Sequence, residues 1–198
     1  MKLSCIMPCR NSERWILTAL QSFPIRDDVE LIVIDDNSSD ETYALVNAYK
    51  RHTPLRITLI HNDTQIYPCG CMNKGIDIAQ GEYFTQTDSD DYLLTEKFCE
   101  LLDQNRHEDL VFFWNEINNF DVWKPELIDG LCDHICWYKK DFVKDYRQPN
   151  EGKWGMGFPF HRHLLSLNPT KYYHQDVIYH YNFPREGSTY DLGKKGLL

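Results

Sequence analysis

Short apolar runs and amphipathic segments alternate along the first 115 residues. The runs Leu3–Met7 and Val29–Ile34 are largely apolar and show no alternation, which is typical of strands covered on both faces. A third strand is expected over Pro54–Ile60. Apolar residues recur at helical spacing over about residues 13–23 and 41–49. Strand, helix and strand at these short intervals predict a parallel sheet with right-handed crossovers.

Capping residues mark the starts of the first two predicted helices. Asn11 or Ser12 is placed to cap the first helix, which Pro24 ends. Ser38 and Glu41 have the spacing of a capping box for the second helix.

The next elements follow the same alternation and then become harder to predict. A helix is expected over about residues 71–79, a strand over 83–87, a helix over 94–102 and a strand over 110–114. Beyond them, aromatic residues and histidines become frequent. There the pattern predicts a strand running into a helix over Ile135–Phe142, a helix over Phe160–Leu167 and a strand over Val177–Tyr181.

Composition places the chain among ordinary globular proteins. It has 198 residues, of which 42% are hydrophobic and 26% charged. The net charge of −9 argues against broad electrostatic binding to nucleic acid. No apolar run approaches the ~20 residues of a membrane span. The start, Met1–Pro8, predicts a first strand instead of a signal peptide, and the seven cysteines lack zinc-site spacing, so we expect a cytoplasmic protein with reduced thiols.

Three carboxylates follow the predicted fourth strand at once. Asp88, Asp90 and Asp91 occupy three of four consecutive positions, where their charges repel one another. Oxygen ligands of this kind suit hard divalent ions such as Mg²⁺ or Mn²⁺. The carboxyl end of a strand is also where ligands bind in open α/β sheets. The alternative interpretation is a solvated turn.

Four stretches of the first half resemble the family 2 glycosyltransferases, which have the GT-A fold, in both order and spacing. The matching stretches are Ile6–Asn11, Leu31–Thr42, Asn73–Ile76 running into Ala79–Tyr83, and Thr87–Asp91. After residue 115 only Val177–Tyr181 and Arg185–Ser188 are similar to the family.

The resemblance implies one α/β domain over residues 1–198. We expect a GT-A type, Rossmann-like and mostly parallel central sheet with helices on both faces, plus a smaller aromatic-rich C-terminal acceptor region. Residues 1–115 would bind the nucleotide-sugar, and residues 116–198 would form the acceptor side.

The implied activity is transfer of one sugar, with inversion, from a nucleotide-sugar to a hydroxyl acceptor, with Mn²⁺ or Mg²⁺. A UDP-sugar is the expected donor. The acceptor stays open among a glycan, a lipid-linked sugar, a protein and a modified nucleobase, and so does the oligomeric state. Two other functions are considered: a catalytically inactive nucleotide-sugar-binding protein and a nucleotidyltransferase. The stretch Cys9–Glu13 lacks the glycines expected of a triphosphate loop in the latter.

Site roles also follow from the resemblance. Pro8 would edge the nucleobase, Asp36 or Asp35 would bind the uracil imide, and Asp88 would reach the ribose. Asn73, in a matching stretch, is a further candidate for binding the nucleotide-sugar.

The predicted metal ligands lie mainly in the acidic cluster. Asp90 would act in catalysis by holding the metal, with Asp91 and Asp88 as further ligands. His180 is a candidate ligand of metal or phosphate, and the alternative is a partly buried strand histidine.

Two departures from the family affect the site. Met72 stands where relatives often have an arginine for the diphosphate, and Arg10 is the candidate to replace it. The late Glu-Asp pair that supplies the base in inverting members is missing. Glu151, beside a glycine-rich loop, is the candidate base, with Asp176 and His161 as alternatives.

Overall fold

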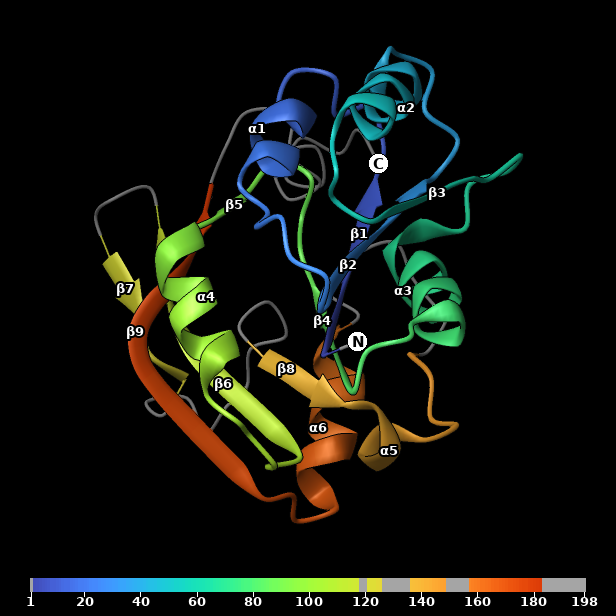
Figure 1. The fold of residues 1–198 in the computed structure, drawn as a ribbon. Coiled ribbons are helices and arrows are strands. Elements are labelled where there is room, and N and C mark those ends of the chain that lie inside the picture. Colours follow the sequence, from blue (N-terminus) through green and yellow to red (C-terminus); the bar gives the residue numbers. More distant parts are fainter. Residues whose placement is uncertain (1, 118–120, 126–135, 149–156, 183–198) are drawn as a thin grey trace.

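A single mixed sheet forms the centre of the molecule, with helices on both of its faces (Figure 1). The computed structural model describes residues 2–117, 121–125, 136–148 and 157–182. The strands are β1 (Leu3–Cys9), β2 (Val29–Asp35), β3 (Ile57–His61), β4 (Tyr83–Gln86), β5 (Tyr92–Leu93), β6 (Leu110–Ile117), β7 (Asp121–Trp123), β8 (Cys136–Lys139) and β9 (Lys171–Tyr181). The helices are α1 (Ile16–Gln21), α2 (Thr42–His52), α3 (Tyr67–Ile78), α4 (Thr95–Asp103), α5 (Lys140–Val143) and α6 (Gly157–Ser166).

The first four strands form the parallel part of the sheet. Their order is β3-β2-β1-β4, and each neighbouring pair is parallel. All seven residues of β2 are buried, as expected of a strand with a helix layer on each face. The parallel arrangement predicted from the alternating pattern is therefore confirmed.

Two hydrophobic clusters lie on the two faces of this sheet. Cys5 and Met7 of β1 join the cluster that includes apolar residues of α1, α2 and α4. Ile6, between them, joins the other cluster, with residues of α3, α5 and α6. Successive strand residues point to opposite faces, so both faces are covered, and the predicted fold class is confirmed. None of the helices in the described part of the chain has the length and apolar character to cross a membrane.

The later strands extend the same sheet in mixed directions. β8 is antiparallel to β4 and β6, β9 is parallel to β6, and β5 is antiparallel to β9. β6 continues to Ile117 and so crosses the boundary expected at residue 115. β9 has 11 residues and curves along the edge of the molecule (Figure 1), whereas only its last five were predicted as a strand.

Helix α3 begins four residues earlier than predicted. Its first residue is Tyr67, and Pro68 lies in the first turn, where a missing backbone N–H leaves no helical hydrogen bond unmade. Further along, α3 packs tightly on β1. A Cβ added at Gly75 would lie 2.4 Å from Cγ2 of Ile6, so a glycine is required at this contact.

The predicted helix caps are wrong. The Ser12 side chain bonds to Ser89, and the first amides of the α1 region reach the Ser12 carbonyl instead. The Ser38 hydroxyl accepts a hydrogen bond from the Asn11 amide, so it does not cap α2. Both serines are used to join loops, which their local spacing does not reveal.

Candidate functional site

Three parallel strands end next to one another at one edge of the sheet. Cys9 of β1 pairs with Asp35 of β2, and Ile6 of β1 pairs with Gln86 at the end of β4. Polar loops follow each of these strands. In open α/β sheets, ligands bind outside these carboxyl ends, so this edge is the candidate site.

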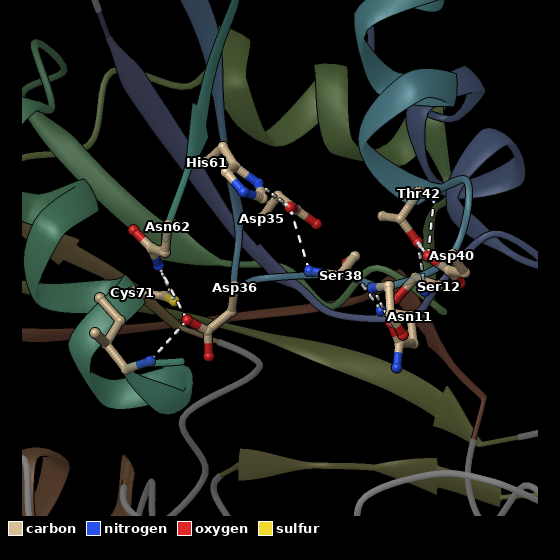
Figure 2. Close-up of polar contacts among 12 residues, drawn as sticks. Asn11, Ser12, Asp35, Asp36, Ser38, Asp40, Thr42, His61, Asn62 and Cys71 are labelled. Carbon is tan, nitrogen blue, oxygen red and sulfur yellow. Dashed lines mark hydrogen bonds and ion pairs between the residues drawn. The ribbon is translucent and has the colours of Figure 1, made fainter. Parts of the chain in front are cut away.

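The loops after β1 and β2 are joined by reciprocal hydrogen bonds (Figure 2). The Asn11 side-chain oxygen accepts from the Ser39 amide at 2.9 Å, and the Asn11 amide donates to Ser38 Oγ at 3.0 Å. The Ser12 amide donates to Thr42 Oγ1 at 2.7 Å. Asn11 has φ 50°, a left-handed conformation that asparagine tolerates better than most residues. The two loops therefore hold each other in place.

Asp40 completes this junction. Its Oδ1 accepts from the Thr42 amide at 3.0 Å and the Thr42 hydroxyl at 2.6 Å, and its Oδ2 accepts from the Glu13 amide at 3.2 Å. Burial acts to raise the pKa of Asp40, but these hydrogen bonds outweigh it, so the pKa lies below its ordinary value.

Asp36 directly follows β2, and its side chain reaches the start of α3, where both carboxylate oxygens accept hydrogen bonds. Figure 2 shows the side chain beside Asn62 and α3. Oδ1 accepts from Asn62 Nδ2 at 3.0 Å and from the Ile66 amide at 2.8 Å, and Oδ2 accepts from the Tyr67 amide at 2.8 Å. Amides at a helix start favour an anionic group. Lys74 Nζ donates to Asn62 Oδ1 at 2.7 Å, which turns the amide nitrogen of Asn62 toward Asp36.

Asp35, the last residue of β2, is buried and has different partners from Asp36. Its Oδ2 lies 2.6 Å from His61 Nδ1 and accepts from the Ser38 amide at 3.4 Å. Its Oδ1 is buried and, among the described atoms, lacks a hydrogen-bond partner. Burial, together with the charge of Asp35, raises the pKa of the Cys9 thiol well above its ordinary value. The two predicted alternatives, Asp35 and Asp36, thus occupy different surroundings.

The acid turn, defined as Asp88–Asp91, follows β4. One carboxylate oxygen from each of Asp88, Asp90 and Asp91 lies within 4.8 Å of the others. Asp88 and Asp90 are partly exposed, whereas Asp91 is buried. Burial, and then the charges of Asp88 and Asp90, raise the pKa of Asp91 well above its ordinary value. An oxygen-only set of this kind fits a hard divalent cation.

The acid turn contacts both the β1 loop and the last described strand. The hydroxyls of Ser89 and Ser12 lie 2.7 Å apart. The Asp88 amide donates to the Tyr179 hydroxyl at 2.8 Å, and that hydroxyl donates to Asp91 Oδ2 at 2.7 Å. The strand that contains Tyr179 was predicted, but the contact of its side chain with the acid turn was not. No local sequence signal indicates which distant turn a strand side chain reaches.

The other predicted binding residues have varied surroundings. Pro8 lies in β1 opposite Ile34, near the site edge. Arg10 is exposed in the loop that follows β1. Asn73 exchanges two hydrogen bonds with the backbone of Gln148, at 2.9 and 2.8 Å, and so fastens that segment to α3. The nucleotide roles of these residues stay predictions.

His180 lies outside the three-carboxylate group. Its Nδ1 is 2.8 Å from Glu116 Oε1, and its ring stacks on Tyr92 with 4.3 Å between centroids. These contacts agree with the alternative of a buried strand histidine, and its role as a ligand stays a prediction.

Two of the three base candidates lie in the described residues, and each of these has a partner outside the acid turn. Glu151 lies outside those residues. His161 is buried, with Nδ1 3.0 Å from the Tyr138 hydroxyl, and Asp176 lies 3.8 Å from Lys97 on the surface.

Met72 and three aromatic residues of the predicted acceptor region belong to the core. Met72 is buried against the sheet, so the position where relatives often have an arginine faces the core. Of the C-terminal aromatics, Trp137, Tyr138 and Phe160 are buried core residues.

The family model for "Glycosyl transferase family 2" matches residues 4–186. This is most of the chain, so the chain belongs to that family. The resemblance found in the sequence is confirmed.

Curated relatives match about half of the chain. A GalNAc(5)-diNAcBac-PP-undecaprenol beta-1,3-glucosyltransferase of Campylobacter jejuni is 39% identical over 104 residues, which is 51% of this chain and 33% of that protein. A poly(ribitol-phosphate) beta-glucosyltransferase of Bacillus spizizenii is 35% identical over 101 residues, 48% of this chain and 16% of that protein. The aligned part is thus a third or less of each relative.

Solved structures match nearly the whole chain. Staphylococcus aureus TarS 1–349 in complex with UDP-GlcNAc has a TM-score of 0.82 and 25% identity, covering 95% of this chain and 60% of that one. The mannosyltransferase PcManGT of Pyrobaculum calidifontis, with GDP-Man and Mn²⁺, has a TM-score of 0.73 and 17% identity, covering 94% and 58%. At the latter identity the likeness shows the fold alone.

Proposed function

We propose that the chain transfers one sugar from a nucleotide-sugar, first of all a UDP-sugar, to a hydroxyl acceptor with inversion and with a divalent cation. The observation that carries the proposal is the acid turn. Its three carboxylates lie within 4.8 Å of one another where three parallel strands end. Like charges at this distance repel, and a bound divalent cation would balance them and could in turn attract the diphosphate of the donor.

The donor set fits Mn²⁺ or Mg²⁺, since it consists of carboxylate oxygens. Such a cation, when bound, neutralises the charge that builds on the leaving diphosphate. The partly exposed Asp88 and Asp90 would hold it. Asp91 already has both carboxylate oxygens in hydrogen bonds, to Tyr179 and Asn182.

The other end of the site would bind the nucleoside. Asp36, whose rotamer is fixed by the start of α3, would accept a hydrogen bond from the imide N–H of uracil, and Pro8 would edge the ring. Asp88 would also reach the ribose. The exposed Arg10 would approach the diphosphate. It would thereby take the role of the arginine that relatives often have at the position of Met72, which is buried here.

The base would remove the proton of the acceptor hydroxyl while that oxygen forms its bond to the anomeric carbon and the bond to the diphosphate breaks. Glu151 is the candidate for this step. Inversion is supported by relatives named for β linkages, since a β bond formed from an α-linked donor requires inversion. The donor class is supported by the UDP-GlcNAc complex of TarS.

The test is a turnover assay with a panel of UDP-sugars and with acceptors from each of the four predicted classes. We expect UDP release and a β-linked product with Mn²⁺ and neither product with EDTA. Binding of UDP-sugars without turnover of any acceptor would favour the nucleotide-sugar-binding alternative. Release of pyrophosphate from a nucleoside triphosphate would favour a nucleotidyltransferase.

A further inference from the structure

The acid turn is fastened by residues that lie far from it in the sequence. Tyr179 comes from β9, 88 residues after Asp91, and is buried. Its hydroxyl accepts from the Asp88 amide at 2.8 Å and donates to Asp91 Oδ2 at 2.7 Å. A buried hydroxyl that both accepts and donates holds its two partners at a fixed separation.

A second residue from the same end of the chain holds the other side of the turn. The Asn182 amide donates to Asp91 Oδ1 at 2.8 Å, and its side-chain nitrogen donates to the Asp90 carbonyl at 3.4 Å. Both carboxylate oxygens of Asp91 therefore bond to β9 or to the residue that follows it.

The strands on each side of the turn explain why such fastening matters. Before the turn, β4 is paired with β1, which ends at the proposed nucleoside site. Directly after it, β5 pairs with β9 through Tyr92 and Leu93, the latter opposite Tyr179. The acid turn thus spans two strand pairs, and the placement of Asp88 and Asp90 depends on β9.

We infer that Tyr179 and Asn182 are positioning residues of the cation site, and that Asp91 is their anchor within the turn and not a cation ligand. The inference rests on the proposed function for the identity of the ligand. Its physical basis is that residues behind metal ligands orient them before the cation arrives, and their loss commonly weakens metal binding by about 10–100-fold.

The test compares Tyr179→Phe with Tyr172→Phe. Tyr172 is on the same strand, but its hydroxyl bonds to Gln104, away from the acid turn. Mn²⁺ binding is measured in the presence of UDP from the EPR signal of free Mn²⁺. We expect Tyr179→Phe to weaken Mn²⁺ binding at least about tenfold, with UDP affinity in EDTA unchanged, and Tyr172→Phe to bind as the wild type does.

A third variant, Asp91→Asn, tests whether Asp91 holds the turn in place or binds the cation. Asp91→Asn keeps an acceptor for the Asn182 amide, so we expect its loss of Mn²⁺ affinity to be smaller than that of Asp90→Asn. The inference is overturned if Asp91→Asn is as severe as Asp90→Asn, or if folded Tyr179→Phe binds Mn²⁺ with wild-type affinity.

Amide hydrogen exchange tests the fastening without any ligand. We expect the Asp88 amide to exchange faster in Tyr179→Phe than in the wild type, and thermal unfolding shows whether each variant is folded. Should the wild type bind no Mn²⁺, the proposed function fails. The exchange rate of the Asp88 amide still tests whether Tyr179 positions the turn. If that rate is the same in Tyr179→Phe and in the wild type, the positioning role is rejected.

Discussion

The ends of β2 and β4 both carry carboxylates, but their surroundings differ. Asp36, after β2, has three hydrogen-bond donors from Asn62 and the start of α3. In the acid turn after β4, the carboxylates of Asp88 and Asp90 lie within 4.8 Å of each other and of Asp91. The protein itself supplies hydrogen-bond donors to the Asp36 carboxylate. The carboxylates of the acid turn need a bound cation to balance their charges. We therefore expect stability to depend on Asp36 and not on Asp90, whereas substrate binding or turnover should depend on both.

The largest effect is expected from Asp90→Asn. Loss of a cation ligand should reduce turnover at least about a thousandfold, because metal assistance supplies several kcal/mol at the transition state. Stability should stay unchanged or rise, since one of three close charges is removed. Steady-state turnover and thermal unfolding measure the two effects. The control is Asp27→Asn, an exposed acid before β2, and equal turnover in both variants would contradict the assignment.

Asp36→Ala should lower stability, and it also removes the proposed acceptor for the uracil imide. It leaves donors at the start of α3 and on Asn62 without their acceptor, which should lower the free energy of unfolding by about 3 kcal/mol and the melting temperature by roughly 10 °C. Thermal unfolding checks this. Asp63→Ala, at an exposed acid in the segment before α3, should melt as the wild type does. If the two variants melt alike, Asp36 does not hold this segment.

Lys74→Met tests the orientation of Asn62. Without the Lys74 ammonium, the Asn62 amide is free to turn its oxygen toward Asp36 and repel it. We expect UDP affinity to fall about three- to tenfold, equivalent to roughly one hydrogen bond, as measured by calorimetry. Lys50→Met, at an exposed position of α2, is the matched control. Identical affinities would show that Asn62 needs no such orientation.

The smallest effect is expected at Asp40, and it depends on pH. The folded pKa of Asp40 lies below its ordinary value, so its hydrogen bonds stabilise the protein above the unfolded pKa, about 3.9. This stabilisation is lost as the pH falls through the folded pKa. Asp40→Ala should be less stable by about 1 kcal/mol at pH 7. In denaturant titrations the difference in unfolding free energy between the variant and the wild type should shrink below about pH 4. A difference that does not change with pH would be evidence against stabilisation by the ionised Asp40 carboxylate.

The sequence predicted the parallel half of the fold well because its signals are local. The buried strands β1 and β2 are apolar runs, and the acids follow β4 directly. The sequence could not distinguish Asp91 from Asp88 and Asp90, since only the folded chain buries Asp91 against Tyr179.

The later strands β6, β8 and β9 were predicted only in part, and the missing parts have a physical reason. β9 pairs with β6 through irregular register between Phe113 and Asn115, so the two-residue alternation is interrupted. β5 has two residues and exists through its pairing with β9. Helix caps were mispredicted for a similar reason, because Ser12 bonds to Ser89, 77 residues away.

The central claim is that the acid turn binds a divalent cation together with the diphosphate of the nucleotide-sugar. Calorimetric titration of UDP, with Mn²⁺ and then with EDTA, tests it most directly on the wild type and on Asp90→Asn. We predict that Mn²⁺ tightens UDP binding at least tenfold in the wild type, which corresponds to about 1.4 kcal/mol, and has little effect in the variant. Equal UDP affinity with Mn²⁺ and with EDTA in the wild type would contradict the account.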